Sequence, residues 1–407
     1  MSDLLFTNAA EIVTCRDGST AAVIRGSALA VRAGSIIAVG SEEEVRASTH
    51  APEHVDCLGG VLTPGFVDSH THALFGGWRA AEYEMRARGI PYMEIARRGG
   101  GIHASVRDVR ARSEDELVEL ARPRLDAMLR LGTTTAEIKS GYGLETETEL
   151  RQLRAVRRLA AEGPLDLVPT FLGAHEVPAE YASRTDDYVD LVCSEMIPAV
   201  AAERLAVFCD VFMEPGVFDG DQARRVLEAG RAHGLAPKLH ADELEGSGGA
   251  ELAASLGAAS ADHLGAISEA GIDALAVSAT VATLLPATLF FLGRTRYAPA
   301  RTLLDRGARI ALATDFNPGS APSPSMPLVL TIACSQMALT PLEALHAATA
   351  GGARALGLDD ARGTLVPGAP ADLILWDVVD HREIAYRFGD PPIRGVWKRG
   401  RRRVERL

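Results

Sequence analysis

Cysteine and aromatic residues are scarce in this chain of 407 residues. The five cysteines are widely scattered, odd in number and never spaced as a Cys-x-x-Cys pair. This pattern indicates neither a disulfide framework nor a structural zinc site. Aromatic residues make up only 5% of the chain, but hydrophobic residues as a whole reach 47%, so the sequence predicts a globular protein with a large core.

Positive charge is scarce as well. The 42 lysines and arginines are outnumbered by 54 aspartates and glutamates, which gives a net charge of −12. Such a surface repels nucleic acids and anionic membranes, and it favours a small diffusible substrate as the partner. The one strong basic run, residues 398–403, is of a kind that sometimes binds nucleic acid or anionic lipid. We interpret it as a solvated final strand, because the rest of the chain is acidic.

Long apolar runs are missing too. No uninterrupted apolar run approaches the length of a membrane span, and the N-terminus lacks a basic stretch followed by an apolar core. We therefore expect neither export nor membrane anchoring. The cysteines then fit the role of small buried hydrophobic side chains in a reducing cytoplasm.

The middle of the chain, residues 62–356, alternates apolar β-branched runs with amphipathic stretches at helical spacing. The clearest helices cover residues 114–131 and 146–161. The candidate strands, eight in all, are residues 65–68, 134–138, 167–171, 210–213, 237–240, 260–263, 283–286 and 310–314. Strands separated by helices pair in parallel through crossover connections, so this order predicts an α/β fold with a closed (β/α)8 barrel of the TIM type. An open doubly wound sheet is the alternative.

The two ends of the chain contain short β-like runs. They cover residues 28–32 and 35–39 before the middle region, and residues 363–365 and 371–377 after it. Neither end is long enough to fold alone. We therefore predict that residues 1–61 and 357–407 form one composite β-sandwich domain beside a barrel domain of residues 62–356.

His70 and His72 follow the apolar run at residues 61–67. Residues two apart on a strand point to the same side, so both imidazoles can face the barrel interior and share one metal ion. By itself a His-x-His pair is a weak indication, because histidines also serve as hydrogen-bonded structural residues.

Other polar residues fall at the ends of the predicted strands. They are Lys139, His175, Glu214, His240, Glu243, His263 and Asp315. The carboxyl ends of barrel strands form the active-site face, so we expect these residues to converge there. Imidazoles and a carboxylate hold Zn²⁺ or Fe²⁺ and leave a position for water, whose lowered pKa makes it a nucleophile. Taken singly, His263 also fits a core histidine, and Asp315 a helix-cap or turn carboxylate.

This arrangement resembles the amidohydrolase superfamily, in which His-x-His lies on the first strand, single histidines lie on the fifth and sixth, and an aspartate lies on the eighth. Residues 64–72 and 368–373 also match segments that recur in that family. The resemblance implies a metal-bearing barrel with a small β-sandwich built from both termini, and an enzyme that hydrolyses a carbon–nitrogen bond.

Further segments resemble a smaller group of that superfamily, which opens the ring of 4-imidazolone-5-propanoate in histidine degradation and yields N-formimidoyl-L-glutamate. These segments are residues 99–102, 137–144, 171–175, 240–243, 260–264 and 313–320. The resemblance implies that the metal ligands are His70, His72, His240 and Asp315. It implies ligand contacts from Arg79, Tyr142, His175, Glu243, Asn317, Gly319 and Ser320. It implies catalytic roles for Glu243, His263 and Asp315.

The number of ions follows from the position of a lysine. Binuclear members of the superfamily usually carry a carboxylated lysine on the fourth strand, whereas Lys139 lies on the second predicted strand. We therefore expect one divalent ion, Zn²⁺ or Fe²⁺, with Glu214 as an alternative bridging group. In our hypothesis, Asp315 and His263 orient and deprotonate the attacking water. Glu243 then protonates the departing ring nitrogen, or alternatively supports His240 from behind.

The carboxylate tail of such a substrate needs a cationic partner. Arg79 and Tyr142 suit that role, since a guanidinium matches a carboxylate in bidentate fashion, although for Arg79 a surface salt bridge is the alternative. His175 would hydrogen-bond either the ring or the tail. Residues 317–320 form a predicted turn whose backbone donors could bind a carboxylate or an oxyanion.

Two other functions stay open for the sequence alone. A deaminase of an aminated heterocycle would use the same kind of water but would release ammonia, whereas ring opening of an imidazolone releases none. A non-catalytic relative would keep the barrel as a binding scaffold, but such relatives usually lose ligands that are all present here. A homodimer is implied by the resemblance only.

Overall fold

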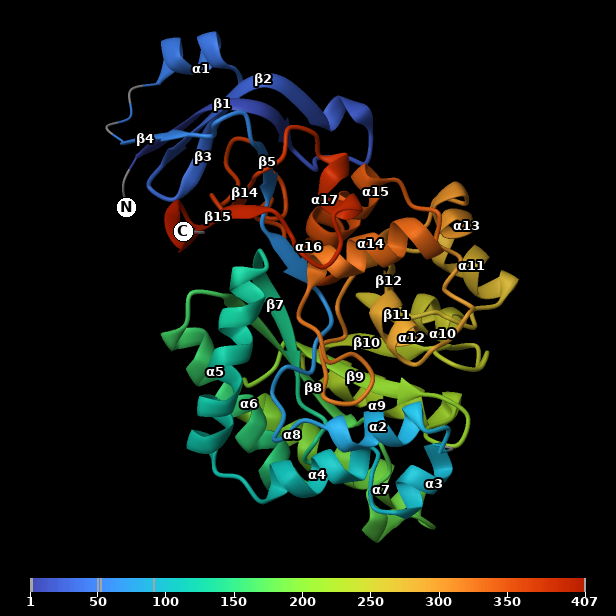
Figure 1. Ribbon diagram of the computed structural model, residues 1–407. Helices are drawn as coiled ribbons and strands as arrows, with labels where there is room; N and C mark the ends of the chain where they lie inside the picture. Colours follow the sequence, from blue (N-terminus) through green and yellow to red (C-terminus); the bar gives the residue numbers. More distant parts are fainter. Residues whose placement is uncertain (1–2, 50, 52, 91, 406–407) are drawn as a thin grey trace.

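Two eight-stranded sheets organise the chain in this computed structural model, which describes residues 3–49, 51, 53–90 and 92–405 (Figure 1). One sheet is a parallel barrel and the other is a mixed sheet beside it. The barrel strands are β6 (Phe66–Asp68), β7 (Thr133–Lys139), β8 (Asp166–Ala174), β9 (Phe208–Met213), β10 (Ala236–Ala241), β11 (Ser260–His263), β12 (Val281–Leu284) and β13 (Ile310–Leu312). Each strand pairs in parallel with the next along the chain, which confirms the predicted (β/α)8 architecture.

The barrel closes just beyond the ends of its first and last strands. Thr71 and Phe316 form a parallel bridge, the N–H of Asp315 donates to the carbonyl of His70 over 3.0 Å, and the N–H of His72 donates to the carbonyl of Phe316 over 2.9 Å. Closure and the predicted metal ligands therefore depend on the same short stretches of backbone.

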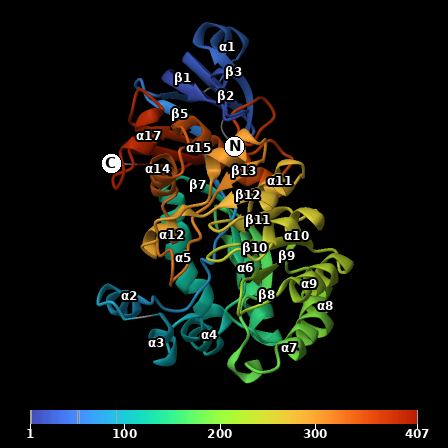
Figure 2. The same ribbon diagram turned by 90° about the vertical axis from the view of Figure 1, so that its right-hand side faces the viewer.

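Helices surround the barrel and connect its strands. They are α5 (Glu114–Arg130), α6 (Thr146–Glu162), α7 (Thr185–Leu191), α8 (Ile197–Ala202), α9 (Gly220–Ala232), α10 (Gly249–Ser255), α11 (Glu269–Ala276), α12 (Pro286–Phe291), α13 (Ala300–Asp305), α14 (Met326–Gln336), α15 (Pro341–His346) and α16 (Gly352–Ala355). Between β6 and β7 the chain adds three helices, α2 (Ala80–Ala87), α3 (Tyr92–Arg97) and α4 (Ile102–Arg110). Figure 2 shows these three grouped at the end of the barrel away from the terminal sheet.

One predicted strand is displaced along the chain. The sequence pattern placed it at residues 283–286, whereas β12 ends at Leu284 and Pro286 is the first residue of α12. Proline has no N–H to give to a sheet, but its fixed φ fits the first turn of a helix. The two long helices predicted at 114–131 and 146–161 coincide with α5 and α6.

Strands from both ends of the chain form the second sheet, as predicted. They are β1 (Leu4–Val13), β2 (Val23–Arg32), β3 (Ser35–Ser41), β4 (Glu53–Asp56), β5 (Val61–Pro64), β14 (Leu373–Trp376), β15 (Ile393–Lys398) and β16 (Arg401–Glu405). Leu62 of β5 lies between Ile12 of β1 and Leu375 of β14, so the N-terminal and C-terminal strands meet at β5. Figure 1 shows them side by side in blue and red. The short helix α1 (Glu42–Ser48) packs on β2 and β3, and α17 (Arg382–Tyr386) packs on α14 and α15.

Two details of the C-terminal region differ from or refine the sequence pattern. The β-like run at 363–365 is a turn and not a strand, because Gly363 has a φ of +77° and a side chain there would collide with Thr349. The basic run at 398–403 spans the hairpin between β15 and β16, and the Nζ of Lys398 is buried against Asp372 at 2.5 Å and Asp166 at 2.8 Å. Among the described residues, no helix combines the length and apolar character that crossing a membrane requires.

Candidate active site

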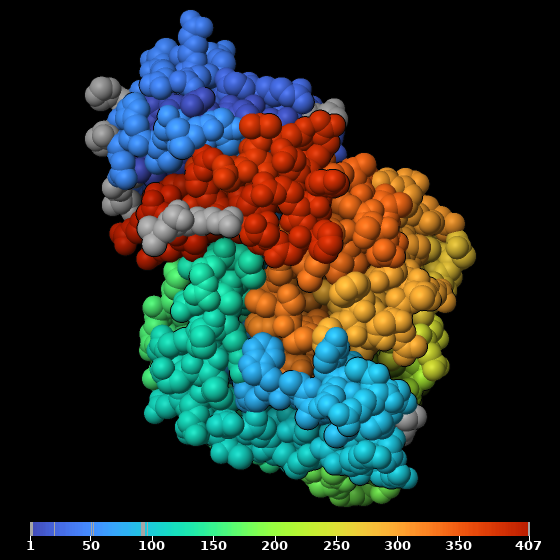
Figure 3. All heavy atoms as spheres, in the orientation of Figure 1, coloured from blue at the N-terminus to red at the C-terminus, as the bar shows by residue number. Residues whose placement is uncertain are grey.

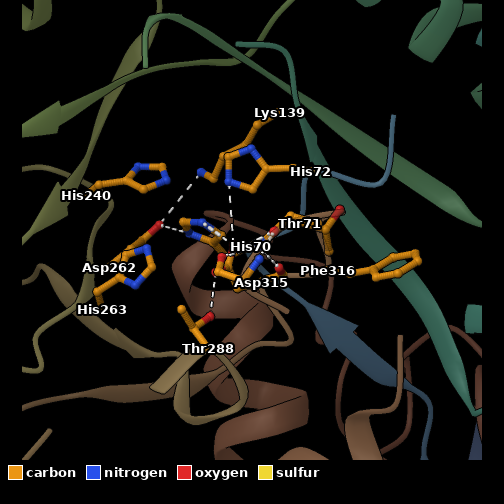
Figure 4. A network of polar contacts seen from close by, with 12 residues as sticks. His70, Thr71, His72, Lys139, His240, Asp262, His263, Thr288, Asp315 and Phe316 are labelled. Atoms are coloured by element: carbon orange, nitrogen blue, oxygen red, sulfur yellow. Dashed lines mark hydrogen bonds and ion pairs between the residues drawn. The ribbon is translucent and has the colours of Figure 1, made fainter. Parts of the chain in front are cut away.

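His70 and His72 lie just beyond the end of β6, and both imidazoles are buried. They are two positions apart along the chain, with only Thr71 between them, so their side chains project to the same side. Figure 4 shows these rings close to His240 of β10 and to Asp315, which follows β13. The ring centroids of His70 and His240 are 4.5 Å apart. The structure thus brings together the four residues that the sequence predicted as metal ligands.

Asp315 lies against both histidines of the first strand. Its Oδ1 is 3.5 Å from the Nε2 of His70 and 3.6 Å from the Nε2 of His72. Its other oxygen, Oδ2, accepts a hydrogen bond of 2.5 Å from the hydroxyl of Thr288 in α12. Thr288 therefore fixes the carboxylate so that one oxygen stays turned toward the imidazoles.

His263, at the end of β11, has a backbone conformation that is rare for a residue with a side chain. Its φ is +81°, and Asp315 also lies in the left-handed region with a φ of +53°. Each such residue costs of order 1–3 kcal/mol, and such strain clusters at functional sites. The His263 ring centroid is 5.2 Å from that of His240 and 5.3 Å from that of His70. The unusual backbone therefore occurs where side chains must be aimed at a common point.

The geometry fits a metal ion. Ligand atoms of His70, His72 and Asp315 lie within 4.8 Å of one another, and the same holds for His70, His240 and His263 and for His72, His175 and His240. The Nε2 atoms of His70 and His240 are buried and have no hydrogen-bond partner among the described residues. Buried polar nitrogens are rarely left without a partner, so these atoms indicate a bound group. Imidazole and carboxylate donors suit Zn²⁺ or Fe²⁺.

The protonation states suit metal binding as well. Burial lowers the pKa of His70, His72 and His263 well below the ordinary value, and it lowers the pKa of His175 to about 3. The imidazoles are therefore neutral at physiological pH, and neutral imidazole is the form that binds metals. Burial also raises the pKa of Asp315 to about 6.

Two buried aspartates, Asp262 and Asp210, hydrogen-bond the predicted ligands on the side away from the proposed metal, and the sequence patterns did not predict a role for them. The Oδ2 of Asp262 lies 2.6 Å from the Nδ1 of His70, and the Oδ2 of Asp210 lies 3.0 Å from the Nδ1 of His240. A carboxylate on Nδ1 leaves Nε2 free for a metal and fixes the ring orientation. Asp262 directly precedes His263, so its place inside a matching segment was the one available signal.

Two lysines neutralise this carboxylate layer inside the barrel. Lys139 lies 2.7 Å from Asp210 and 2.8 Å from Glu137, and Lys238 lies 3.0 Å from Glu137. Burial by itself would lower the pKa of Lys139, but the carboxylates of Asp210 and Glu137 outweigh it and raise that pKa. The Lys139 amine is thus engaged in ion pairs, which supports the expectation of a single ion.

Glu243 follows β10 and faces His263. Its Oε2 is 3.6 Å from the Nε2 of His263, and burial together with the nearby Asp315 raises its pKa well above the ordinary value. Glu214, the alternative bridging group, is used differently. Its carboxylate accepts the backbone N–H groups of Glu243, Leu244 and Glu245 over 2.8–3.2 Å. Glu214 therefore supports the loop that carries Glu243, which argues against a bridging role.

His175 and Tyr142, two of the predicted substrate contacts, lie close to His72. The ring of His175 stacks on that of His72 at 4.9 Å, and its Nδ1 lies 3.0 Å from the carbonyl oxygen of Gly141. Tyr142 is buried with its ring centroid 5.9 Å from that of His72, and burial raises its pKa, so the phenol stays neutral. The position of His175 makes it either a contact for substrate or a further metal donor.

Arg79 lies outside this cluster, at the start of α2. Its Nε and Nη2 bind the carboxylate of Glu82 at 3.0 and 2.7 Å. A Cβ added to Gly319 would lie 2.3 Å from the Nη1 of Arg79, so the arginine packs directly on the loop that follows β13. The backbone donors of that loop were predicted to bind a carboxylate or an oxyanion, and the structure differs. The Oδ1 of Asn317 already accepts the N–H groups of Gly319 and Ser320 at 2.8 and 2.7 Å, so these donors stabilise the turn itself.

Comparisons with known proteins agree with this fold. A family model described as "Amidohydrolase family" matches residues 61–403. The structure is similar to that of an adenosine deaminase from Xanthomonas campestris with bound zinc, with a TM-score of 0.73 and 21% identity over 99% of this chain and 93% of that chain. It is also similar to a 5-methylcytosine deaminase from Klebsiella pneumoniae, with a TM-score of 0.75 and 17% identity over 99% and 98% of the two chains. At these identities the likeness shows the fold.

Sequence relatives are more specific. The chain is 49% identical to an imidazolonepropionase of Symbiobacterium thermophilum, over 98% of this chain and 96% of that protein. It is 46% identical to imidazolonepropionases of Solibacter usitatus, over 98% of both chains, and of Geobacillus kaustophilus, over 96% and 95%. Similarity of this degree over almost the whole length, together with the family model, shows that the chain belongs to the imidazolonepropionases of the amidohydrolase family, hydrolases of a carbon–nitrogen bond in a cyclic amide.

Proposed function

We propose that the site opens the ring of 4-imidazolone-5-propanoate to give N-formimidoyl-L-glutamate, with one divalent ion held by His70, His72, His240 and Asp315. The observation that carries this proposal is the pair of buried, unpartnered Nε2 atoms of His70 and His240, set beside the Asp315 carboxylate. When bound, such an ion supplies an acidified water and polarises the ring carbonyl.

The attacking water needs a proton acceptor. Asp315 offers Oδ1, because Thr288 occupies Oδ2, and His263 offers an imidazole that burial keeps neutral. Both face the point on which the histidine rings converge, so both can orient the water and take its proton. The water oxygen then bonds to the ring carbonyl carbon.

Collapse of the resulting intermediate breaks the bond to the adjacent ring nitrogen, which must receive a proton. Glu243 is placed for that step, with its Oε2 3.6 Å from the Nε2 of His263. A proton taken from water by His263 can pass to Glu243 and on to the leaving nitrogen, which restores both side chains. Buried surroundings exclude bulk water from this path, because His263 is only 6% exposed.

The propanoate tail is bound on the α2 side. Arg79 supplies a guanidinium that can pair with the carboxylate in bidentate fashion, and Tyr142 and His175 supply hydrogen bonds beside it. Gly319 lets the guanidinium approach the loop after β13, while Asn317 and Ser320 hold that loop in shape. These residues determine which ring substituent is accepted.

Metal analysis of the purified protein, together with an assay of imidazolone consumption and of ammonia release, tests the proposal. We expect close to one Zn²⁺ or Fe²⁺ per chain, consumption of the imidazolone and no release of ammonia. His72→Ala should lose the metal, whereas His233→Ala, which changes an exposed histidine at the end of α9, should retain it. Full turnover by metal-free protein, or ammonia as a product, would contradict the proposal. A homodimer, also proposed, is tested by sedimentation velocity.

A further inference from the structure

Glu82 accepts hydrogen bonds from Arg79, the proposed tail-binding arginine, and from the backbone of a second segment at Gly101. It lies in the first turn of α2, three residues after Arg79. Its Oε1 is 3.0 Å from the Nε of Arg79 and its Oε2 is 2.7 Å from the Nη2. Both side chains are well buried, at 16% and 15% exposed. One edge of the guanidinium is thus fully engaged by an internal carboxylate.

The same carboxylate ties a second segment to the arginine. The N–H of Gly101, the residue before α4, donates to the Oε1 of Glu82 over 3.1 Å. A Cβ on Gly100 would lie 3.0 Å from the Glu82 carboxyl group, so the glycine run packs closely on this side chain. Glu82 therefore has three donors from two segments, and its position is closely determined.

The opposite edge of the guanidinium faces the loop after β13. The Nη1 of Arg79 packs on Gly319, and the carbonyl of Gly319 accepts a hydrogen bond of 3.1 Å from the Nη2 of Arg86. The guanidinium carbon of Arg86 also lies 4.9 Å from the ring centroid of Phe291, at the end of α12. Figure 3 shows the light-blue segment that carries α2 lying against the orange part of the barrel. Arg79 is therefore held between Glu82 and the loop that carries Asp315.

We propose that Glu82 is a positioning residue that fixes the guanidinium of Arg79 through its Nε and Nη2. Nη1, which lies beside Gly319 and binds no carboxylate of the described residues, is then left for the carboxylate of the substrate. The inference rests on the tail-binding role of Arg79 proposed above. An arginine side chain has several rotamers, and restricting it to one costs conformational entropy. If Glu82 already holds the side chain in one rotamer, substrate binding does not have to supply that free energy. Glu82 thereby favours substrates with a carboxylate tail over substrates without one.

Steady-state kinetics of Glu82→Ala test this role with two substrates, the imidazolone with its propanoate tail and the same ring with an uncharged propanamide tail. We expect KM for the propanoate substrate to rise about tenfold, with kcat and the propanamide KM within about twofold of wild type. Glu82→Gln keeps one acceptor and should show a smaller rise. Glu84→Ala, which removes an exposed partner of Arg88 on the same helix, is the matched control and should change neither KM.

A double variant shows whether Glu82 acts through Arg79. If it does, Glu82→Ala should have no further effect on KM in an Arg79→Leu background. A lowered KM in Glu82→Ala would mean that its carboxylate competes with the substrate, and this would overturn the inference. An unchanged KM in Glu82→Ala, beside a raised KM in Arg79→Leu, would overturn the inference alone. An unchanged KM in Arg79→Leu would overturn both the inference and the tail-binding role.

Discussion

Replacing Asp262 with asparagine should weaken metal binding by about tenfold. The Oδ2 of Asp262 lies 2.6 Å from the Nδ1 of His70, a short, charge-assisted contact. Asparagine can still accept a hydrogen bond at that position, but a neutral bond contributes about 1 kcal/mol where a charged one contributes about 1.5–3. The difference is roughly 0.5–2 kcal/mol, and a value near the middle of that range corresponds to about a factor of ten in affinity, at the lower end of the effect of such supporting groups on metal binding.

Competition with a chromophoric chelator measures that affinity without reference to turnover. Asp372→Asn is the control, because Asp372 is also a buried aspartate and lies 2.5 Å from Lys398, but in the terminal sheet. Asp262 also lies 3.7 Å from the Nζ of Lys139, so both variants should lose stability, because each leaves a buried lysine with a weaker partner. Only Asp262→Asn should release metal more readily. An affinity within twofold of wild type for Asp262→Asn would refute the role assigned to the Asp262 carboxylate.

Two further predictions concern Asp315 and a structural ion pair. Asp315→Asn should reduce kcat by at least about a hundredfold even in samples shown to contain metal, because a proton acceptor for the water is lost; full turnover with metal bound would rule out that role. Burial would raise the pKa of Glu343, but hydrogen bonds from Arg301 and Thr340 outweigh it and lower the pKa to about 2. The stability that this group contributes, about 1–2 kcal/mol after allowance for its partial exposure, is therefore present above pH 4.5 and lost as the pH falls toward 2. In urea unfolding, the free energy of unfolding should be higher for wild type than for Glu343→Gln by an amount that is constant near pH 7 and shrinks as the pH falls from 4.5 toward 2. A difference in unfolding free energy that persists at pH 2 would contradict the assignment.

The sequence by itself determined the barrel, the composite terminal sheet and the convergence of the predicted ligands. Alternating apolar runs and amphipathic helices are local patterns. In a parallel barrel the carboxyl ends of all strands lie on one face, independently of the length and conformation of the loops. His70, His72, His240 and Asp315 could therefore be placed together from their positions at strand ends alone. The family followed from the same segments, and the relatives confirmed it.

Tertiary structure decided what supports those residues. Asp262 lies against His70 although 192 positions separate them in the chain. In the buried charge layer, Lys139 of β7 pairs with Asp210 of β9, and Lys238 of β10 pairs with Glu137 of β7. Such pairings depend on barrel register and on which side chain points inward at each layer, and no local pattern encodes them. For the same reason the sequence did not distinguish a substrate-binding role of Arg79 from a surface salt bridge, whereas the structure shows one edge of its guanidinium bound to Glu82. Local chemistry thus determined which groups meet, and long-range packing determined how each one is held.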